Sequence, residues 1–189
     1  MCGIVAYIGH RDATPILIEG LKRLEYRGYD SAGVAVESPD GDLRIVKTVG
    51  RVRVLEEAIE EKGDIHGPVG IAHTRWATHG SVTQENAHPH SYDLESDHGI
   101  AIIHNGIIEN YQSLRTWLKE KGHSFKGETD TEVLVHLIGE LYRGDLEKAV
   151  QAALKEVEGA YAIAVISRQE PGVMVVARKG SPLMVGFFI

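Results

Sequence analysis

The chain has 189 residues, of which 43% are hydrophobic and 25% are charged, a composition typical of a globular domain with a substantial core. Its 20 basic and 27 acidic side chains give a net charge of −7, which excludes a general attraction to nucleic acid or to anionic membranes. No apolar run approaches the ~20 residues that a membrane-spanning helix needs, and no secretory signal is recognisable. The single cysteine excludes an intrachain disulfide and a multi-cysteine zinc site. We therefore expect a soluble cytoplasmic protein.

The first part of the chain predicts strands and two helices in an irregular order. The segment at 2–8 is apolar and β-branched, which favours a buried strand, and Asp12 is placed to cap a helix. In chain order we expect a strand at 2–8, a helix from the Asp12 cap to Gly28, strands at 33–37 and 43–49, a helix through Leu55 that ends at Gly63, and a strand at 69–73.

The second part predicts three consecutive helices followed by three strands. Residues 74–99 are polar and rich in histidine, and we expect them to be irregular. Thr129 and Glu132 have the spacing of a capping box ahead of an apolar helix, and Trp117 is predicted to face inward. In chain order we expect a strand at 100–104, a helix at 111–121, helices from the Thr129 cap through Leu141 and from the Asp145 cap to Gly159, and strands at 160–166, 173–177 and 183–189.

This order does not alternate strand and helix, so it argues against a parallel doubly wound sheet. Runs of strands separated by runs of helices instead indicate an α+β fold of mostly antiparallel sheets covered by helices. We find no tandem repeat, low-complexity segment or linker, and we expect one domain over residues 1–189.

The cysteine directly follows the initiator methionine. One interpretation is a small buried hydrophobic residue at the start of a strand. The other requires removal of Met1, after which Cys2 carries a free α-amine beside its own thiol. An α-amine has an ordinary pKa near 8 and a thiol near 8.5, so the amine can take the thiol proton. Nucleophile and base would then belong to one residue.

Five segments decide between these interpretations: CGIVAYIG from Cys2, RLEYRGYDSAG from Arg23, HTRWATHG from His73, HNGIIENY from His104 and ETDTE from Glu128. In this order they resemble the glutaminase domain of the glutamine–fructose-6-phosphate aminotransferases. These enzymes are class II glutamine amidotransferases of the N-terminal-nucleophile hydrolase superfamily. The resemblance covers nearly the whole chain.

The resemblance implies a four-layer αββα sandwich and hydrolysis of L-glutamine to L-glutamate and ammonia through a thioester on Cys2. In the family, the ammonia passes to a C-terminal sugar isomerase domain that makes glucosamine 6-phosphate from fructose 6-phosphate, and the full-length enzyme is expected to be a homodimer. That second domain is absent from this sequence. The chain ends in an apolar run at 184–189, so we expect a glutaminase domain truncated at its C-terminal end.

Amide hydrolysis passes through a tetrahedral oxyanion that needs hydrogen-bond donors. Asn105 supplies a side-chain NH2, and Gly106 supplies a backbone N–H that can be approached closely because no Cβ intervenes. By itself, Asn-Gly is more typical of a hairpin turn. The resemblance instead implies that these two residues form the oxyanion hole.

Selecting glutamine over other amides requires its α-carboxylate and α-ammonium to be recognised. Arg75 offers a planar two-pronged donor for the carboxylate, and Asp130 offers an acceptor for the ammonium. Taken alone, the two would be a surface arginine and a second residue at a helix start. The resemblance implies that both bind substrate.

The resemblance extends the site to four further residues. It implies that Thr78 and His79 line the same loop as Arg75, and that Trp76 lies on a flap that closes over bound glutamine. It also implies that Arg27 lies near the site, in the loop that supports the N-terminal cysteine.

The ten histidines raise the question of a metal site. His88 and His90 lie in a predicted loop, and no pair has the i, i+4 spacing of a zinc-protease motif. We expect neither a metal nor a cofactor, and we expect these histidines to hydrogen-bond the loop that carries Arg75. Two other hypotheses stay open: a different N-terminal-nucleophile amide hydrolase, and a catalytically silent binding domain if Met1 is retained.

Overall fold

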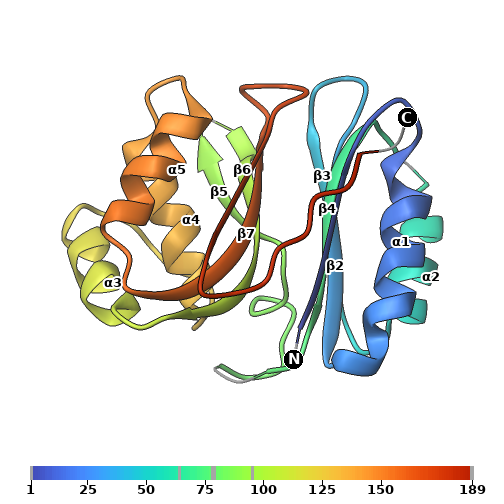
Figure 1. Cartoon of the computed structure of the whole chain (residues 1–189), viewed down its shortest axis with the longest axis horizontal. Coiled ribbons are helices and arrows are strands. Elements are labelled where there is room, and N and C mark those ends of the chain that lie inside the picture. Colours follow the sequence, from blue (N-terminus) through green and yellow to red (C-terminus); the bar gives the residue numbers. More distant parts are fainter. Residues whose placement is uncertain (1, 64, 78–79, 95, 188–189) are drawn as a thin grey trace.

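The computed structural model describes residues 2–63, 65–77, 80–94 and 96–187. Two four-stranded sheets face each other, and helices cover the outer face of each (Figure 1). The predicted αββα sandwich is thus confirmed. Among the described residues, no helix is long and apolar enough to cross a membrane.

The first sheet and its two helices come from the first part of the chain. The elements are β1 (Gly3–Ile8), α1 (Ala13–Leu24), a 3-10 turn (Glu25–Arg27), β2 (Ser31–Glu37), β3 (Leu43–Val49), α2 (Val52–Lys62) and β4 (Val69–Arg75). The strand order is β1-β4-β2-β3, and all pairs are antiparallel. The end of β4 therefore lies beside the start of β1, which brings Arg75 close to Cys2.

The second sheet and three helices come from the rest of the chain. The elements are β5 (His90–Leu94), β6 (Ser96–Ile108), α3 (Tyr111–Glu120), α4 (Asp130–Leu141), α5 (Leu146–Lys155), β7 (Gly159–Ser167) and β8 (Met174–Lys179). The strand order is β5-β6-β7-β8, again antiparallel throughout.

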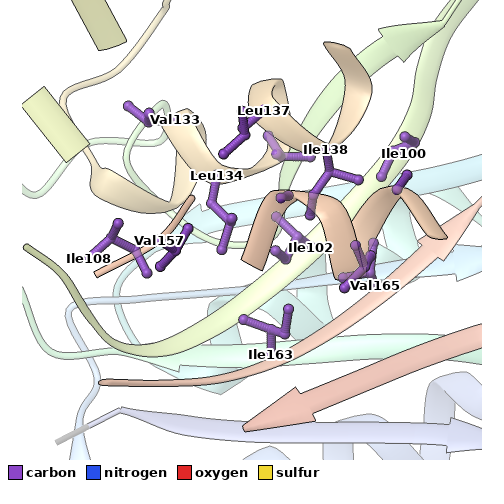
Figure 2. Close-up of a cluster of buried hydrophobic side chains, with 14 of the residues drawn as sticks. Ile100, Ile102, Ile108, Val133, Leu134, Leu137, Ile138, Val157, Ile163 and Val165 are labelled. Atoms are coloured by element: carbon purple, nitrogen blue, oxygen red, sulfur yellow. The ribbon is translucent and has the colours of Figure 1, made fainter. Parts of the chain in front are cut away.

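Side-chain alternation along β6 shows how the second sheet is buried on both faces. Ile100 and Ile102 pack with the helices α4 and α5, whereas Ala101 and Ile103 pack with residues of the first sheet. Figure 2 shows Ile100 and Ile102 of β6 in one cluster with Leu134, Ile138 and other apolar side chains of α4. A third cluster lies between α1, α2 and the first sheet. The four layers are therefore held by three apolar interfaces, each driven by burial of aliphatic surface.

The predicted helix caps are present. The Asp12 carboxylate accepts from the backbone N–H of Thr14 at 3.1 Å, and the Asp145 carboxylate accepts from Lys148 N at 2.9 Å. Gly63 ends α2 with a φ of 71°, a left-handed conformation that glycine adopts without steric cost.

Several sequence predictions are wrong in detail. The stretch predicted to be irregular contains β5, and β6 runs to Ile108 instead of ending at residue 104. The third helix of the second half ends at Lys155, not at Gly159. Residues 183–187 form no strand, and Trp117 is 40% exposed instead of facing inward.

Candidate active site

Residues from separate segments meet around one small cavity of about 40 Å³ at the end of the two sheets. Cys2 precedes β1, Arg75 and Trp76 lie at the end of β4, and Asp130 begins α4. Six of the nine predicted site residues line this cavity: Cys2, Arg75, Trp76, Asn105, Gly106 and Asp130. The same cavity is lined by His88, His104, Thr129 and Thr131, which were not predicted as site residues.

The thiol of Cys2 lies against the backbone of the chain after β4. Its Sγ accepts from the N–H of Trp76 at 3.3 Å and lies 3.6 Å from the carbonyl oxygen of the same residue. Gly3 follows directly and donates its N–H to Thr74 Oγ1 at 3.2 Å. The first residues of the chain are thus fixed to β4 by main-chain contacts.

Burial raises the pKa of the Cys2 thiol, and the Trp76 N–H only partly opposes this. A thiol with a raised pKa stays protonated at neutral pH unless a base takes its proton. Among the described residues, the hydrogen bonds of Sγ involve only the Trp76 backbone. The base that the sequence analysis predicts is the α-amine of Cys2 itself, once Met1 is removed.

Asn105 and Gly106 do not form a hairpin turn, because both lie within β6 and pair with Ala162 and Tyr161 of β7. The side-chain NH2 of Asn105 donates to the carbonyl oxygen of Cys2 at 3.1 Å. Gly106 has a φ of 136°, and a Cβ there would lie 2.0 Å from the Ala160 carbonyl oxygen. Only glycine fits this position, and Gly106 lines the cavity.

Arg75 is a buried cation, with 5% of its surface exposed. Its guanidinium donates to the carbonyl oxygens of Ser81 at 3.1 Å and of Gly80 at 3.5 Å. Burial lowers the pKa of Arg75, while the charges of Cys2, Asp30 and Asp130 oppose this shift. The side chain is thus anchored to the following loop and lies within electrostatic range of the thiol.

The Asp130 carboxylate is held at the start of α4. Its Oδ2 accepts from the backbone N–H of Ile108 at 2.8 Å, and its Oδ1 lies 3.4 Å from the hydroxyl of Thr131. Asp130 is not the helix cap, because the Thr129 hydroxyl takes that position and accepts from Glu132 N at 3.2 Å. The Asp130 carboxylate is therefore not needed to start the helix.

Trp76 and its neighbours are supported by the segment around Asp30. The Asp30 carboxylate accepts from the N–H of Ala77 at 2.6 Å, and the Asp30 N–H donates to the Arg75 carbonyl at 3.0 Å. The Tyr29 ring packs edge-on against Trp76, with centroids 5.9 Å apart. Trp76 is 45% exposed and lines the cavity, so its side chain lies partly at the protein surface.

Three predicted site residues are not placed at the cavity. Thr78 and His79 lie outside the described residues. Arg27 is exposed, and its guanidinium carbon lies 5.8 Å from the ring centroid of Tyr26. Its predicted place near the substrate receives no support from the residues that line the cavity.

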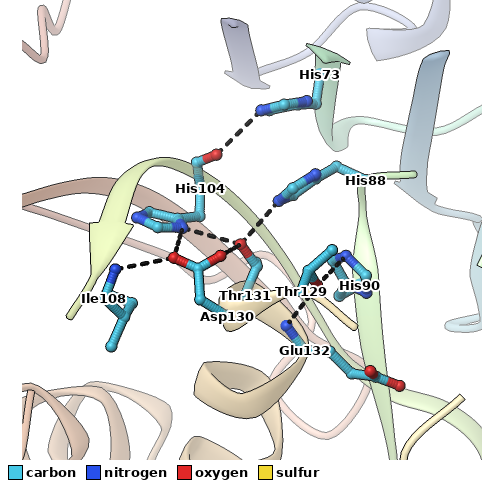
Figure 3. Close-up of polar contacts among 9 residues, drawn as sticks. All are labelled: His73, His88, His90, His104, Ile108, Thr129, Asp130, Thr131 and Glu132. Atoms are coloured by element: carbon cyan, nitrogen blue, oxygen red, sulfur yellow. Dashed lines mark hydrogen bonds and ion pairs between the residues drawn. The ribbon is translucent and has the colours of Figure 1, made fainter. Parts of the chain in front are cut away.

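The histidines of the central region form a buried layer (Figure 3), of which His88 and His104 line the cavity. Their hydrogen bonds do not run to the loop after Arg75 as expected. His88 and His104 contact Thr131, His90 contacts Thr129, and His73 contacts the carbonyl of His104. Over the described part of the chain, no three His, Cys, Asp or Glu side chains are arranged to hold a metal ion.

Known proteins share the sequence of this chain over most of its length. The family model "Glutamine amidotransferase domain" matches residues 73–185. The chain is 54% identical over 186 residues to glutamine–fructose-6-phosphate aminotransferase [isomerizing] of Clostridium acetobutylicum and 58% identical over 189 residues to that of Bacteroides thetaiotaomicron. Each match covers 98% of this chain but only 30% of the relative, so the chain spans about a third of the length of these relatives.

Solved structures show the same fold. Glutamine phosphoribosylpyrophosphate amidotransferase from B. subtilis, complexed with ADP and GMP, superposes with a TM-score of 0.80 at 29% identity, covering 94% of this chain and 37% of that one. A glutamine aminotransferase class-II domain protein from Silicibacter pomeroyi matches in fold with a TM-score of 0.62 at 17% identity, covering 97% of this chain and 79% of that one. The chain belongs to the glutamine amidotransferase domain family.

Proposed function

We propose that this chain hydrolyses L-glutamine to L-glutamate and ammonia through a thioester on Cys2. The observation that carries the proposal is the convergence of Cys2, Arg75, Asn105, Gly106 and Asp130 on one cavity. These residues lie far apart in the sequence, and each matches one requirement of the chemistry. A fold that needed them only for packing would not gather a thiol, a buried cation and a carboxylate around one small space.

The reaction begins with transfer of the thiol proton to the α-amine that Cys2 exposes once Met1 is removed. The thiolate then attacks the side-chain carbonyl carbon of glutamine and forms a C–S bond. The negative charge develops on the carbonyl oxygen, where the Asn105 NH2 and the Gly106 N–H are the proposed donors.

Collapse of this intermediate breaks the C–N bond. The protonated α-amine gives its proton to the leaving nitrogen, which departs as ammonia, and a thioester remains. A water molecule then attacks the thioester and transfers a proton to the same amine. Breaking of the C–S bond releases glutamate, and the thiol is restored.

Recognition of the amino-acid end is assigned to two opposite charges. Arg75 binds the α-carboxylate with its guanidinium, and Asp130 binds the α-ammonium. A cavity of about 40 Å³ has room for about one water molecule, so glutamine enters only when the site widens. Trp76 lines this cavity, and we propose that it belongs to the flap that opens; Thr78 and His79 are proposed to belong to the same loop.

In the longer protein, the ammonia is proposed to pass to a sugar isomerase domain that converts fructose 6-phosphate to glucosamine 6-phosphate. This rests on the names of relatives that are about three times as long as the chain. We further propose that residues 1–189 are the glutaminase domain of that protein, that the whole enzyme is a homodimer, and that it works in the cytoplasm, where a reduced thiol persists.

The proposal is tested by incubating the purified chain with L-glutamine and fructose 6-phosphate. We expect glutamate and ammonia in equal amounts, no amino sugar, and no effect of the sugar phosphate on the rate. The matched Cys2→Ala variant should fold but release neither product. Turnover by that variant would rule out the thioester, and amino sugar from the 189-residue chain would overturn the domain assignment.

A further inference from the structure

The buried layer of histidines, two of which line the cavity, has a polar centre that the mechanism above does not use. His73, His88, His90 and His104 are at most 6% exposed, and Thr131 is 1% exposed. They lie between the end of β4, strand β6 and the start of α4 (Figure 3). A buried polar cluster of this kind is costly unless its hydrogen bonds are matched.

Three polar groups converge on the hydroxyl of Thr131. Its Oγ1 lies 3.0 Å from His88 Nε2, 2.9 Å from His104 Nδ1 and 3.4 Å from Asp130 Oδ1. A hydroxyl has one proton to donate and two lone pairs to accept with, and an ionised carboxylate only accepts. If the hydroxyl donates to Asp130, both imidazoles must donate to the hydroxyl.

This assignment accounts for the buried nitrogen atoms that have no partner. When neutral His88 is protonated on Nε2, its Nδ1 carries no proton, and when neutral His104 is protonated on Nδ1, its Nε2 carries none; we call a nitrogen without a proton bare. His73 must donate from Nε2 to the carbonyl oxygen of His104, 3.0 Å away, which leaves its Nδ1 bare. These three bare nitrogens are the buried histidine atoms for which the structure shows no hydrogen-bond partner.

Among the described residues, the opposite tautomers would leave these three buried N–H groups without a well-formed hydrogen bond, an arrangement that folded proteins rarely contain. The Asn105 side chain and the Ala160 carbonyl are the nearby groups that act on the His73 and His104 rings and raise their pKa values, against the larger effect of burial. A charged imidazole is disfavoured as well. Burial lowers the pKa of His73 to about 3, lowers that of His88 and of His90 well below the usual value, and lowers that of His104. The ring of His88 also stacks on the ring of His73, with centroids 4.1 Å apart, and this contact helps to fix its orientation.

The Asp130 carboxylate is thereby fixed at both oxygens. Oδ2 accepts from the Ile108 N–H of β6 at 2.8 Å, and Oδ1 accepts from Thr131. His104 precedes Asn105 and belongs to the same strand. Through Thr131 and His104, the carboxylate proposed to bind the substrate ammonium is joined to the strand that carries the proposed oxyanion donors.

We propose that Thr131 is a positioning residue for substrate selection: its hydroxyl accepts from neutral His88 and His104 and orients the Asp130 carboxylate toward the α-ammonium of the substrate. The inference rests on the proposed glutaminase function for its substrate. It adds a residue that lines the cavity next to Asp130 and that sets the preference for an α-amino acid over a simple amide by orienting this carboxylate.

The activity test compares the parent chain with Thr131→Val, which keeps the shape but removes the hydroxyl, and with Thr131→Ser, which keeps the hydroxyl. The two substrates are L-glutamine and 4-carbamoylbutanoate, which lacks the α-amine. We expect the valine variant to lose about tenfold or more in kcat/KM for glutamine, the range expected when a buried hydrogen bond is removed. Turnover of 4-carbamoylbutanoate and alkylation of Cys2 by iodoacetamide should be nearly unchanged, and serine should restore the preference.

Equal losses for both substrates, or no rescue by serine, would overturn the proposal. A readout that does not need activity is ¹⁵N NMR of the histidine side chains in the parent chain. We expect the Nε2–H tautomer for His73 and His88 and the Nδ1–H tautomer for His104, and any other set would contradict the network. If the parent chain shows these tautomers but hydrolyses no glutamine, the proposed function fails while the network stands.

Discussion

At the scale of single residues, each proposed role depends on an atom held in place by the backbone of another segment. Cys2 contacts the chain after β4, and Asn105 reaches back to the carbonyl of Cys2. A side chain positioned in this way loses little entropy when charge develops next to it. Substitutions at these positions should therefore affect the chemistry more than the stability.

Asn105→Ala should lower kcat by about 10²–10³, because one oxyanion donor is lost. The control is Asn110→Ala, at the residue that precedes α3, where the side chain bonds Glu156 and Glu158 away from the cavity. Steady-state kinetics with glutamine checks this. A defect confined to KM would place Asn105 in ground-state binding instead of the transition state.

Arg75→Lys keeps the positive charge but removes the fork that can bind a carboxylate with two parallel hydrogen bonds. We expect weaker capture of glutamine, seen as a raised KM, and little change with an amide that lacks the α-carboxylate. Steady-state kinetics with glutamine and with the amide that lacks the α-carboxylate measures this difference. If kcat/KM falls equally for the two substrates, the role of Arg75 is to hold the loop through its hydrogen bonds to Gly80 and Ser81.

Some of these residues can be predicted from the sequence, whereas the role of Thr131 cannot. Cys2 is identifiable because a cysteine after the initiator methionine has chemistry of its own, and the resemblance then locates Asn105 and Arg75. Thr131 lies in the ETDTE segment already taken as a signal, but a threonine at a helix start is ordinary. Its importance arises from His88 and His104, which only the fold brings next to it.

At the scale of elements, the start of α4 combines two functions in neighbouring residues. Thr129 caps the helix, and Asp130 faces the cavity. The Glu132 carboxylate does not reach back to the cap and accepts from the N–H groups of Lys126 and Gly127 instead. Stability and substrate binding can thus be separated by mutation at adjacent positions.

Thr129→Ala should lower the free energy of unfolding by about 1 kcal/mol through loss of the cap. Asp130→Asn should leave the unfolding free energy close to that of the parent while weakening glutamine binding, because the carboxylate is not the cap. Urea denaturation with parallel kinetics measures both. A larger loss of stability from Asp130→Asn than from Thr129→Ala would reverse these roles.

Elements with a single apolar face were predictable, and those that depend on a partner were not. Helices α1, α2 and α4 carry clear caps or stops, so their positions follow from local sequence. Strand β5 is short and begins with His90, and it exists because β6 and α4 lie beside it. The extension of β6 through Asn105 and Gly106 likewise depends on pairing with β7, which local turn preference cannot anticipate.

At the scale of the whole molecule, the buried histidines link stability to pH. The unfolded chain binds a proton at each histidine near pH 6.5, whereas His73 in the folded chain has a pKa of about 3. Below pH 6.5 the unfolded state therefore binds more protons, so the stability is complete above this pH and falls on acidification toward pH 3.

Once the pH is well below 6.5, each such histidine should lower the free energy of unfolding by about 1.4 kcal/mol for every further pH unit of acidification. Urea denaturation at pH 7.5, 6.5 and 5.5 measures the slope. The His73→Gln variant, whose amide can still donate to the His104 carbonyl, should show a smaller slope of unfolding free energy against pH. The decrease should correspond to about one fewer proton taken up on unfolding at acidic pH. The control is His66→Gln at an exposed position, and an equal reduction in that variant would contradict the role of burial.

The central claim is that residue 2 of this chain carries its own base and forms a covalent bond with glutamine. Intact mass spectrometry before and after treatment with an electrophilic glutamine analogue tests it most directly. We predict a mass that lacks Met1, a single adduct that maps to Cys2, and protection by L-glutamine. A chain that retains Met1 and gains no adduct, or an adduct unaffected by glutamine, would contradict the account.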